Sequence, residues 1–162
     1  MATTAKLVAA TQGAFASLMT TELNALANGN AILGATAVDN ATNLDLEIEL
    51  SFKGGGSITA TGSPFLAVYL YPLNGDAATY GDGRFGSAAA GPPGQSYLWA
   101  YIGAIPAASG TVAGYFMRPD GQGPRLMLPR GSWKPVLHNG LGVALSGTGN
   151  ILYYKTTNIQ FV

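Results

Sequence analysis

The clearest periodic pattern in the chain runs from Thr42 to Lys53. Five apolar side chains alternate strictly with polar ones in this segment: Leu44, Leu46, Ile48, Leu50 and Phe52. A period of two predicts a half-buried strand whose other face is in water. That wet face carries the carboxylates of Asp45, Glu47 and Glu49, and the glycines at 54–56 are expected to end the strand.

Several other segments are predicted strands because they are short, apolar and bounded by Gly, Pro or Asn. Phe65–Tyr71 is apolar on both faces, which is typical of a central sandwich strand, and Asn139-Gly140 predicts a tight hairpin turn. The remaining predicted strands are Tyr97–Ile105, Thr111–Arg118, Arg125–Leu128, Trp133–His138, Leu141–Leu145 and Ile151–Val162. About eight strands separated by turn signals favour an all-β fold, an antiparallel β-sandwich of jelly-roll type.

The first 29 residues follow a different pattern. Apolar side chains recur there at nearly helical spacing: Phe15, Leu18, Met19, Leu23 and Leu26. This spacing predicts a short amphipathic helix over Gly13–Ala27, preceded by an extended arm. The alternative is that the whole segment is an arm ordered only by a neighbour. We therefore divide the chain into an N-terminal arm or helix, residues 1–29, and a β-sandwich domain, residues 30–162.

A helix this short is marginal in isolation, so its apolar side chains need a place to be buried. We expect four of them to pack around an oligomer axis or into a partner: Phe15, Leu18, Met19 and Leu26. In the alternative arrangement they close one end of the sandwich within the same chain.

Charged side chains make up only 10% of the residues, against roughly 25% in an ordinary soluble domain. Hydrophobic side chains make up 48%, yet no apolar run reaches the ~18 residues that a membrane-spanning helix needs. The net charge is zero, whereas a nucleic-acid-binding protein would show an excess of Lys and Arg. The composition favours a chain covered by other protein in an assembly, with neither membrane nor nucleic acid as a partner.

The two signs of charge are unevenly distributed. Up to Met117 the chain has three basic and seven acidic residues, and from Arg118 onward five basic and one acidic. Either strands of the two halves interleave in one sheet, or acidic and basic faces meet between subunits. Like charges on one strand face are destabilising unless cations oppose them, so Glu47 is a candidate interface residue. The cations expected to oppose this acidic face, within the chain or across an interface, are Arg125, Arg130 and Lys134.

The connection from Leu73 to Ser96 is long and rich in Gly, Ala and Pro. Loops of more than about 12–15 residues are usually functional, bound to a partner or disordered. This one carries Tyr80 and Phe85 among small residues, and aromatic side chains often anchor interfaces. We therefore expect the connection to contact a partner through Tyr80 and Phe85.

No combination of residues indicates catalysis, a cofactor or a metal site. His138 is the only histidine and cysteine is absent, which removes the common zinc sites. Residues 81–86 match G-x-G-x-x-G, but they lack the preceding strand and following helix that let this motif bind a dinucleotide. We interpret His138 as structural and the chain as a non-enzyme.

Three stretches resemble small virion structural proteins of tailed bacteriophages. They are Thr20–Gly29 running into Asp39–Leu50, Val68–Gly83 and Leu128–Asn158. The resemblance implies a jelly-roll sandwich that sits on the capsid as a decoration or cement protein, and it supplies no catalytic residues.

The expected function is to bind the outer surface of the major capsid protein lattice, as a homo-oligomer and by preference a trimer, and to stabilise the head. The chain would be made in the cytoplasm of the bacterial host. The alternative is a receptor- or glycan-binding module of a tail or head fibre.

Overall fold

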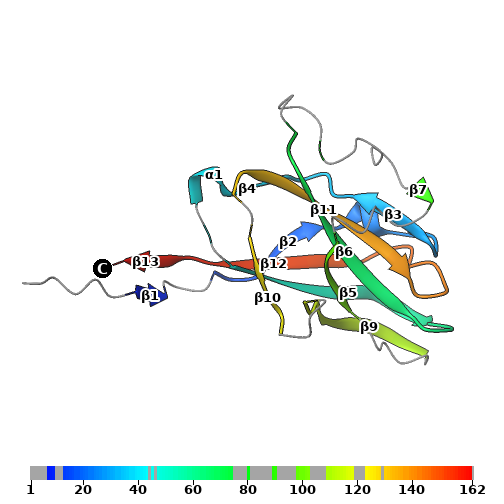
Figure 1. Ribbon diagram of the computed structural model, residues 1–162. Coiled ribbons are helices and arrows are strands. Elements are labelled where there is room, and N and C mark those ends of the chain that lie inside the picture. Colours follow the sequence, from blue (N-terminus) through cyan, green and yellow to red (C-terminus); the bar gives the residue numbers. More distant parts are fainter. Residues whose placement is uncertain are drawn as a thin grey trace, which may run out of the picture.

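The computed structural model describes residues 7–9, 13–43, 45, 47–74, 80, 89–90, 98–102, 109–118, 123–128 and 130–161. Two antiparallel sheets pack face to face in this part of the chain (Figure 1), so the predicted all-β sandwich is confirmed. The strands outnumber the eight expected because several are pieces of only two to four residues.

The first sheet has five strands. Its order is β10 (Arg125–Met127), β5 (Glu47–Thr59), β12 (Ile151–Thr157) and β2 (Ala16–Met19), and β9 (Ser109–Tyr115) pairs with the later part of β5. A register shift separates the two parts of the β5–β9 pairing, between Lys53 and Ser57. The long strand β5 therefore organises this sheet.

The second sheet has six strands. Its order is β7 (Ala89–Ala90), β3 (Asn30–Leu33), β11 (Ser132–Gly140), β6 (Phe65–Pro72) and β8 (Leu98–Ile102), and β4 (Val38–Asp39) also pairs with β11. The two described helices are single turns, a 3-10 helix η1 (Thr21–Leu23) and α1 (Asn40–Asn43). Strand β11 lies at the centre, with β3 and β4 on one side and β6 on the other.

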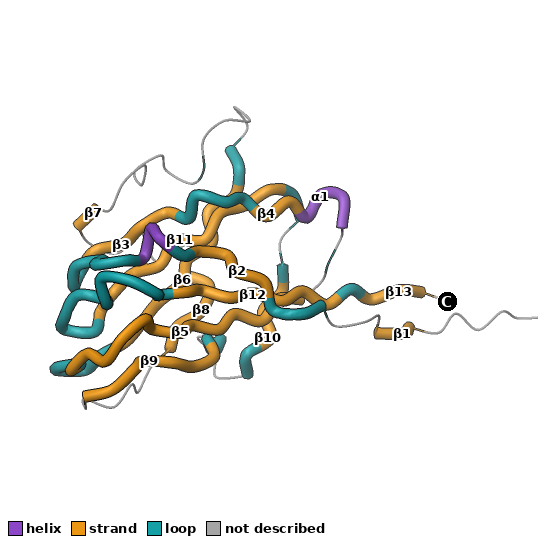
Figure 2. Tube along the Cα trace, turned by 180° about the vertical axis from the view of Figure 1, so that it is seen from behind, coloured by secondary structure: helices purple, strands orange, loops and turns teal. Residues whose placement is uncertain are grey.

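A third, two-stranded sheet joins the ends of the described chain. Strand β1 (Leu7–Ala9) pairs with β13 (Ile159–Phe161), which follows β12 after one residue. Figures 1 and 2 show this ribbon extending beyond the sandwich.

The alternating segment forms a strand with one buried face, as predicted. Ile48, Leu50 and Phe52 are buried against the second sheet, whereas Leu44 and Leu46 lie outside the described residues. The glycines at 54–56 do not end the strand, which continues to Thr59. The prediction failed because these glycines allow close backbone contact rather than a turn: a side chain at Gly55 would overlap the Thr148 carbonyl.

Strand β6 is apolar on both faces because each face meets a separate hydrophobic cluster. Leu66, Val68 and Leu70 face the core between the two sheets. Ala67, Tyr69 and Tyr71 belong to a second cluster on the other side of the strand, together with Ala31 and Val136. The prediction of a central strand is confirmed, and Tyr69 and Tyr71 are packing residues.

The helix predicted over Gly13–Ala27 is wrong. Residues 16–19 form β2, and only residues 21–23 form a single 3-10 turn. The β2–β12 pairing shifts register between Leu152 and Tyr153, and both Leu18 and Met19 are buried. A bulged strand followed by a tight turn thus produces apolar spacing that resembles a helix.

The hairpin turn predicted at Asn139-Gly140 is also wrong, and so is the strand predicted over Leu141–Leu145. Asn139 and Gly140 are the last two residues of β11, paired with Leu66 and Phe65. The chain turns only afterwards, through a loop. The Asn139 side chain is fully buried and holds that loop in place, a tertiary role that the local turn signal does not reveal.

Candidate interaction surfaces

Three of the residues expected at an oligomer axis are core residues instead. Leu18, Met19 and Leu26 are almost fully buried in the same hydrophobic cluster as the sandwich strands. They close the core within the chain, which was the alternative arrangement, and they are not available to a partner. Phe15 differs, because 37% of it is exposed.

The long connection is described at Leu73, Asn74, Tyr80 and the two residues of β7, and Phe85 lies outside the described residues. Tyr80 pairs with Leu73, and its hydroxyl lies 2.9 Å from the Ser132 hydroxyl. The Lys134 ammonium lies 5.0 Å from the centre of its ring. Tyr80 therefore packs partly on its own chain, against the second cluster.

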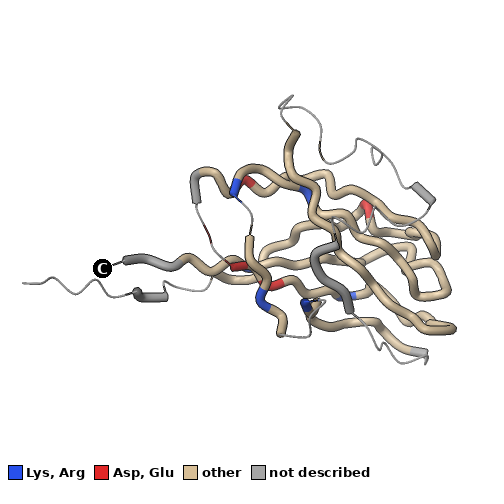
Figure 3. The backbone as a smooth tube through the Cα atoms, in the orientation of Figure 1, with Lys and Arg blue, Asp and Glu red and all other residues tan. Residues whose placement is uncertain are grey.

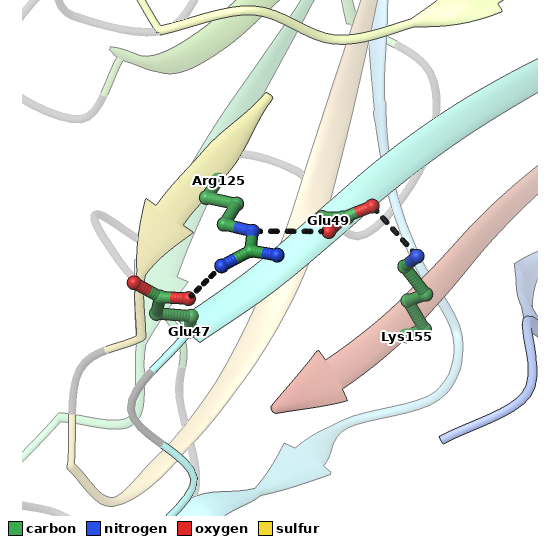
Figure 4. A network of polar contacts seen from close by, with 4 residues as sticks. All are labelled: Glu47, Glu49, Arg125 and Lys155. Carbon is green, nitrogen blue, oxygen red and sulfur yellow. Dashed lines mark ion pairs between the residues drawn. The ribbon is translucent and has the colours of Figure 1, made fainter. Parts of the chain in front are cut away.

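Four charged side chains form a network on the outward face of the five-stranded sheet (Figure 4). Arg125 contacts Glu47 at 3.6 Å and Glu49 at 3.4 Å, and Lys155 contacts Glu49 at 2.9 Å. Strand register explains the geometry, because Arg125, Glu49 and Lys155 form one row across β10, β5 and β12. Of the three cations expected to oppose the acidic face, Arg125 takes part in the network, whereas Lys155, which contacts Glu49, was missed.

Every large hydrophobic side chain that is exposed in the described residues lies on β2, β9, β10 or immediately beside them. These side chains are Phe15, Tyr115, Met117 and Met127. Met127 is 75% exposed and pairs with Glu47, while Tyr115 is 51% exposed and lies 6.0 Å from the Phe15 ring. We call the surface formed by the charged network with Phe15, Tyr115 and Met127 the outer sheet face.

We expect the two glutamates of this network to differ in their contribution to stability. The Glu49 side chain is only 10% exposed and lies between two cations, so Glu49→Gln leaves the largely buried Lys155 without its counter-charge. The loss should be about 2 kcal/mol, below the range for fully buried pairs. Glu47→Gln breaks only its pair with Arg125, which is more exposed to solvent, and this variant should lose less than ~1 kcal/mol of stability.

Urea denaturation of the two variants beside the unchanged chain measures this difference. Equal losses of stability in the two variants would contradict this prediction, because they would mean that the burial of Glu49 does not strengthen its ion pairs.

His138 lies on β11, where it pairs with Ala31 of β3 on one side and with Ala67 of β6 on the other, both of which have small side chains. Its ring meets Phe65 edge-on at 5.4 Å. Burial lowers its pKa below the ordinary 6.5, and a hydrogen bond with the Gly29 backbone opposes that shift. Its Nδ1 is buried and has no hydrogen-bond partner among the described residues.

Because the pKa of His138 is lowered on folding, the unfolded chain takes up a proton more readily than the folded chain. The contribution of His138 to the free energy of unfolding is therefore fully present above its unfolded pKa of 6.5 and is lost as the pH falls from this value toward the lower folded pKa. Melting temperatures measured from weakly alkaline to weakly acidic pH should decrease. The melting temperature of His138→Gln should decrease less over the same pH range. Identical slopes of melting temperature against pH for the two proteins would refute a contribution of His138 to the pH dependence.

A second distinctive surface lies at one end of the sandwich, where buried asparagines tie loops together. Asn139 donates to the carbonyls of Leu26 at 2.8 Å and Val143 at 2.9 Å, and it accepts from the Leu141 amide at 3.0 Å. Asn150 donates to Asn24 and to the Ser146 carbonyl. The Thr61 amide donates to the Leu141 carbonyl at 2.9 Å. The loops at 24–29, 60–64 and 141–150 thus form one unit, which we call the loop end.

The loop end carries no charged residue. There is no Asp, Glu, Lys or Arg at 23–38, 54–75 or 135–154. In Figure 3 these loops are drawn without Lys, Arg, Asp or Glu. Its exposed residues are small and neutral, namely Ala25, Ala27, Asn28, Thr61, Gly62, Ser63, Gly142, Ala144, Gly147, Thr148 and Gly149. Sequence reasoning missed this surface because it depends on three loops meeting in space.

Within the described ranges no three His, Asp or Glu side chains lie together as metal ligands would. None of the described helices has the length and apolar character to cross a membrane. Comparisons with protein-family models, curated proteins and solved structures found no match to this chain.

Proposed function

We propose that this chain is a virion structural protein of a tailed bacteriophage, which decorates the outer surface of the major capsid lattice and stabilises the head. The loop end is the observation that carries the proposal. A rigid surface of small, uncharged residues loses little hydration and little side-chain entropy when another protein covers it. The resemblance of three sequence stretches to such virion proteins supports the same function.

Decoration requires many weak contacts rather than one strong site. Each copy that joins neighbouring capsid subunits adds apolar burial at about 25 cal/mol per Å². Linking neighbours in this way multiplies modest affinities over the whole shell. A charge-poor sandwich with a rigid end suits this role, in which position matters and no reaction takes place.

The position of the chain on the particle tests the proposal. Electron microscopy of the phage with gold-labelled antibody against the chain should show label over the whole head. Label confined to the tail, or particles without label, would contradict it.

The contact surface is tested separately with purified heads that lack the chain. Ala144→Glu places a charge on the exposed loop end and should abolish co-sedimentation with heads. Ala37→Glu adds the same charge at another exposed alanine, in the loop that leads into β4, and should bind normally. If both variants bind alike, the loop end is not the contact surface.

A further inference from the structure

We infer that the outer sheet face is a self-association surface that pairs with the same face of a second copy across a twofold axis. The inference rests on the distribution of exposed apolar side chains and of charge, and it is independent of any binding to capsids.

The first argument is the concentration of apolar exposure on one surface. Phe15, Tyr115 and Met127 are all exposed there. Met117 is the one other large hydrophobic side chain that is exposed in the described residues, and it lies two residues beyond Tyr115. Monomeric proteins seldom gather such side chains, whereas Met, Phe, Tyr and Arg are enriched in the cores of interfaces. A partner that covers this face removes apolar surface from water.

The second argument identifies the partner from the charges. The network on this face has two acidic and two basic groups, so it is neutral as a whole. Arg125 is 55% exposed and the adjacent Glu47 is 32% exposed. A half turn about an axis that lies in the interface plane, midway between these two side chains, would place Arg125 of each copy opposite Glu47 of the other. A surface with balanced charges side by side is therefore complementary to itself.

The third argument is that the face is already held in shape. Glu49 is fixed from both sides by Arg125 and Lys155, and the Lys155 ammonium lies 5.0 Å from the Phe15 ring centre. Few side chains have to be ordered when a second copy docks, which lowers the entropy lost on association.

Sedimentation equilibrium of the purified chain over a range of concentrations tests the inference. The unchanged chain should reach a dimer, and Met127→Glu should raise the dissociation constant at least about tenfold. Met127 is so exposed that folding should be unaffected, which the melting temperature checks. Ala37→Glu is the matched control: it adds the same charge at an exposed alanine outside both surfaces and should leave the dimer intact.

A charge swap shows whether Glu47 and Arg125 meet across the axis. Glu47→Arg and Arg125→Glu should each weaken self-association, because each places like charges opposite one another in a homodimer. An equimolar mixture of the two folded variants should form a mixed dimer, since both contacts then join opposite charges.

A chain that stays monomeric at every concentration, a trimer, or a dimer that survives Met127→Glu would each overturn the inference. Failure of the mixture to associate would overturn the twofold contact between Glu47 and Arg125. If Met127→Glu instead weakened only the binding of monomers to heads, the face would belong to a capsid contact and not to a second copy.

Discussion

Replacing Gly55 with alanine should destabilise the fold by more than about 3 kcal/mol, beyond the usual range for overpacked cores. A Cβ at this position would overlap the carbonyl oxygen of Thr148 and would lie 2.6 Å from the carbonyl carbon of Gly149. These are backbone atoms, so no side-chain rotation relieves the overlap. The Gly55 amide also donates to Asn150 Oδ1 at 3.1 Å, and any shift of the strand would break this bond.

Gly147→Ala is the matched control for Gly55→Ala. It changes a glycine in the loop that faces Gly55, but its Cβ would have no neighbour within 4 Å. Its effect should stay within ~0.5 kcal/mol, as for an ordinary surface substitution. Thermal and urea unfolding of both variants gives the comparison. Similar stabilities for the two would mean that the contact between β5 and the loop is looser than the structure indicates.

The sandwich could be predicted from the sequence because its strands depend on local patterns. The alternation at Ile48, Leu50 and Phe52 encodes a buried face directly, and Phe65–Tyr71 encodes a strand buried on both sides. The charged network could be predicted only in part. The sequence of β5 alone predicts the acidic face. That Lys155, and not Arg130 or Lys134, contacts Glu49 depends on the register between β5 and β12.

The errors have a common physical cause, which is that tertiary contacts override local preference. Apolar spacing at Phe15, Leu18 and Met19 fits a helix, yet hydrogen bonding to β12 draws this segment into the sheet. The candidate interface residues Leu18, Met19 and Leu26 were misassigned for the same reason, because a strand and a tight turn bury them together. The loop end could not be predicted, since its three loops are far apart in the sequence.

Asn139 is the residue whose loss should affect the loop end most. Asn139→Ala removes three hydrogen bonds from a fully buried side chain. The Leu26 carbonyl keeps a second donor, the Leu145 amide at 3.0 Å. The Val143 carbonyl and the Leu141 amide lose the partner that Asn139 provides. Each buried group left unpaired costs about 1–3 kcal/mol, so with the cavity we expect a loss of about 4 kcal/mol.

Two further variants separate the hydrogen bonds from the volume of the side chain. Asn139→Asp keeps the shape and the acceptor for the Leu141 amide but sets a carboxylate against two carbonyl oxygens, so it should be at least as destabilising as alanine. Asn28→Ala removes one exposed bond to the Gly142 amide in the same loop and should lose only about 1 kcal/mol. Urea unfolding ranks the three variants. If Asn139→Asp were as stable as the unchanged chain, the two carbonyl bonds would not hold the loops, and the rigidity of the loop end would need another origin.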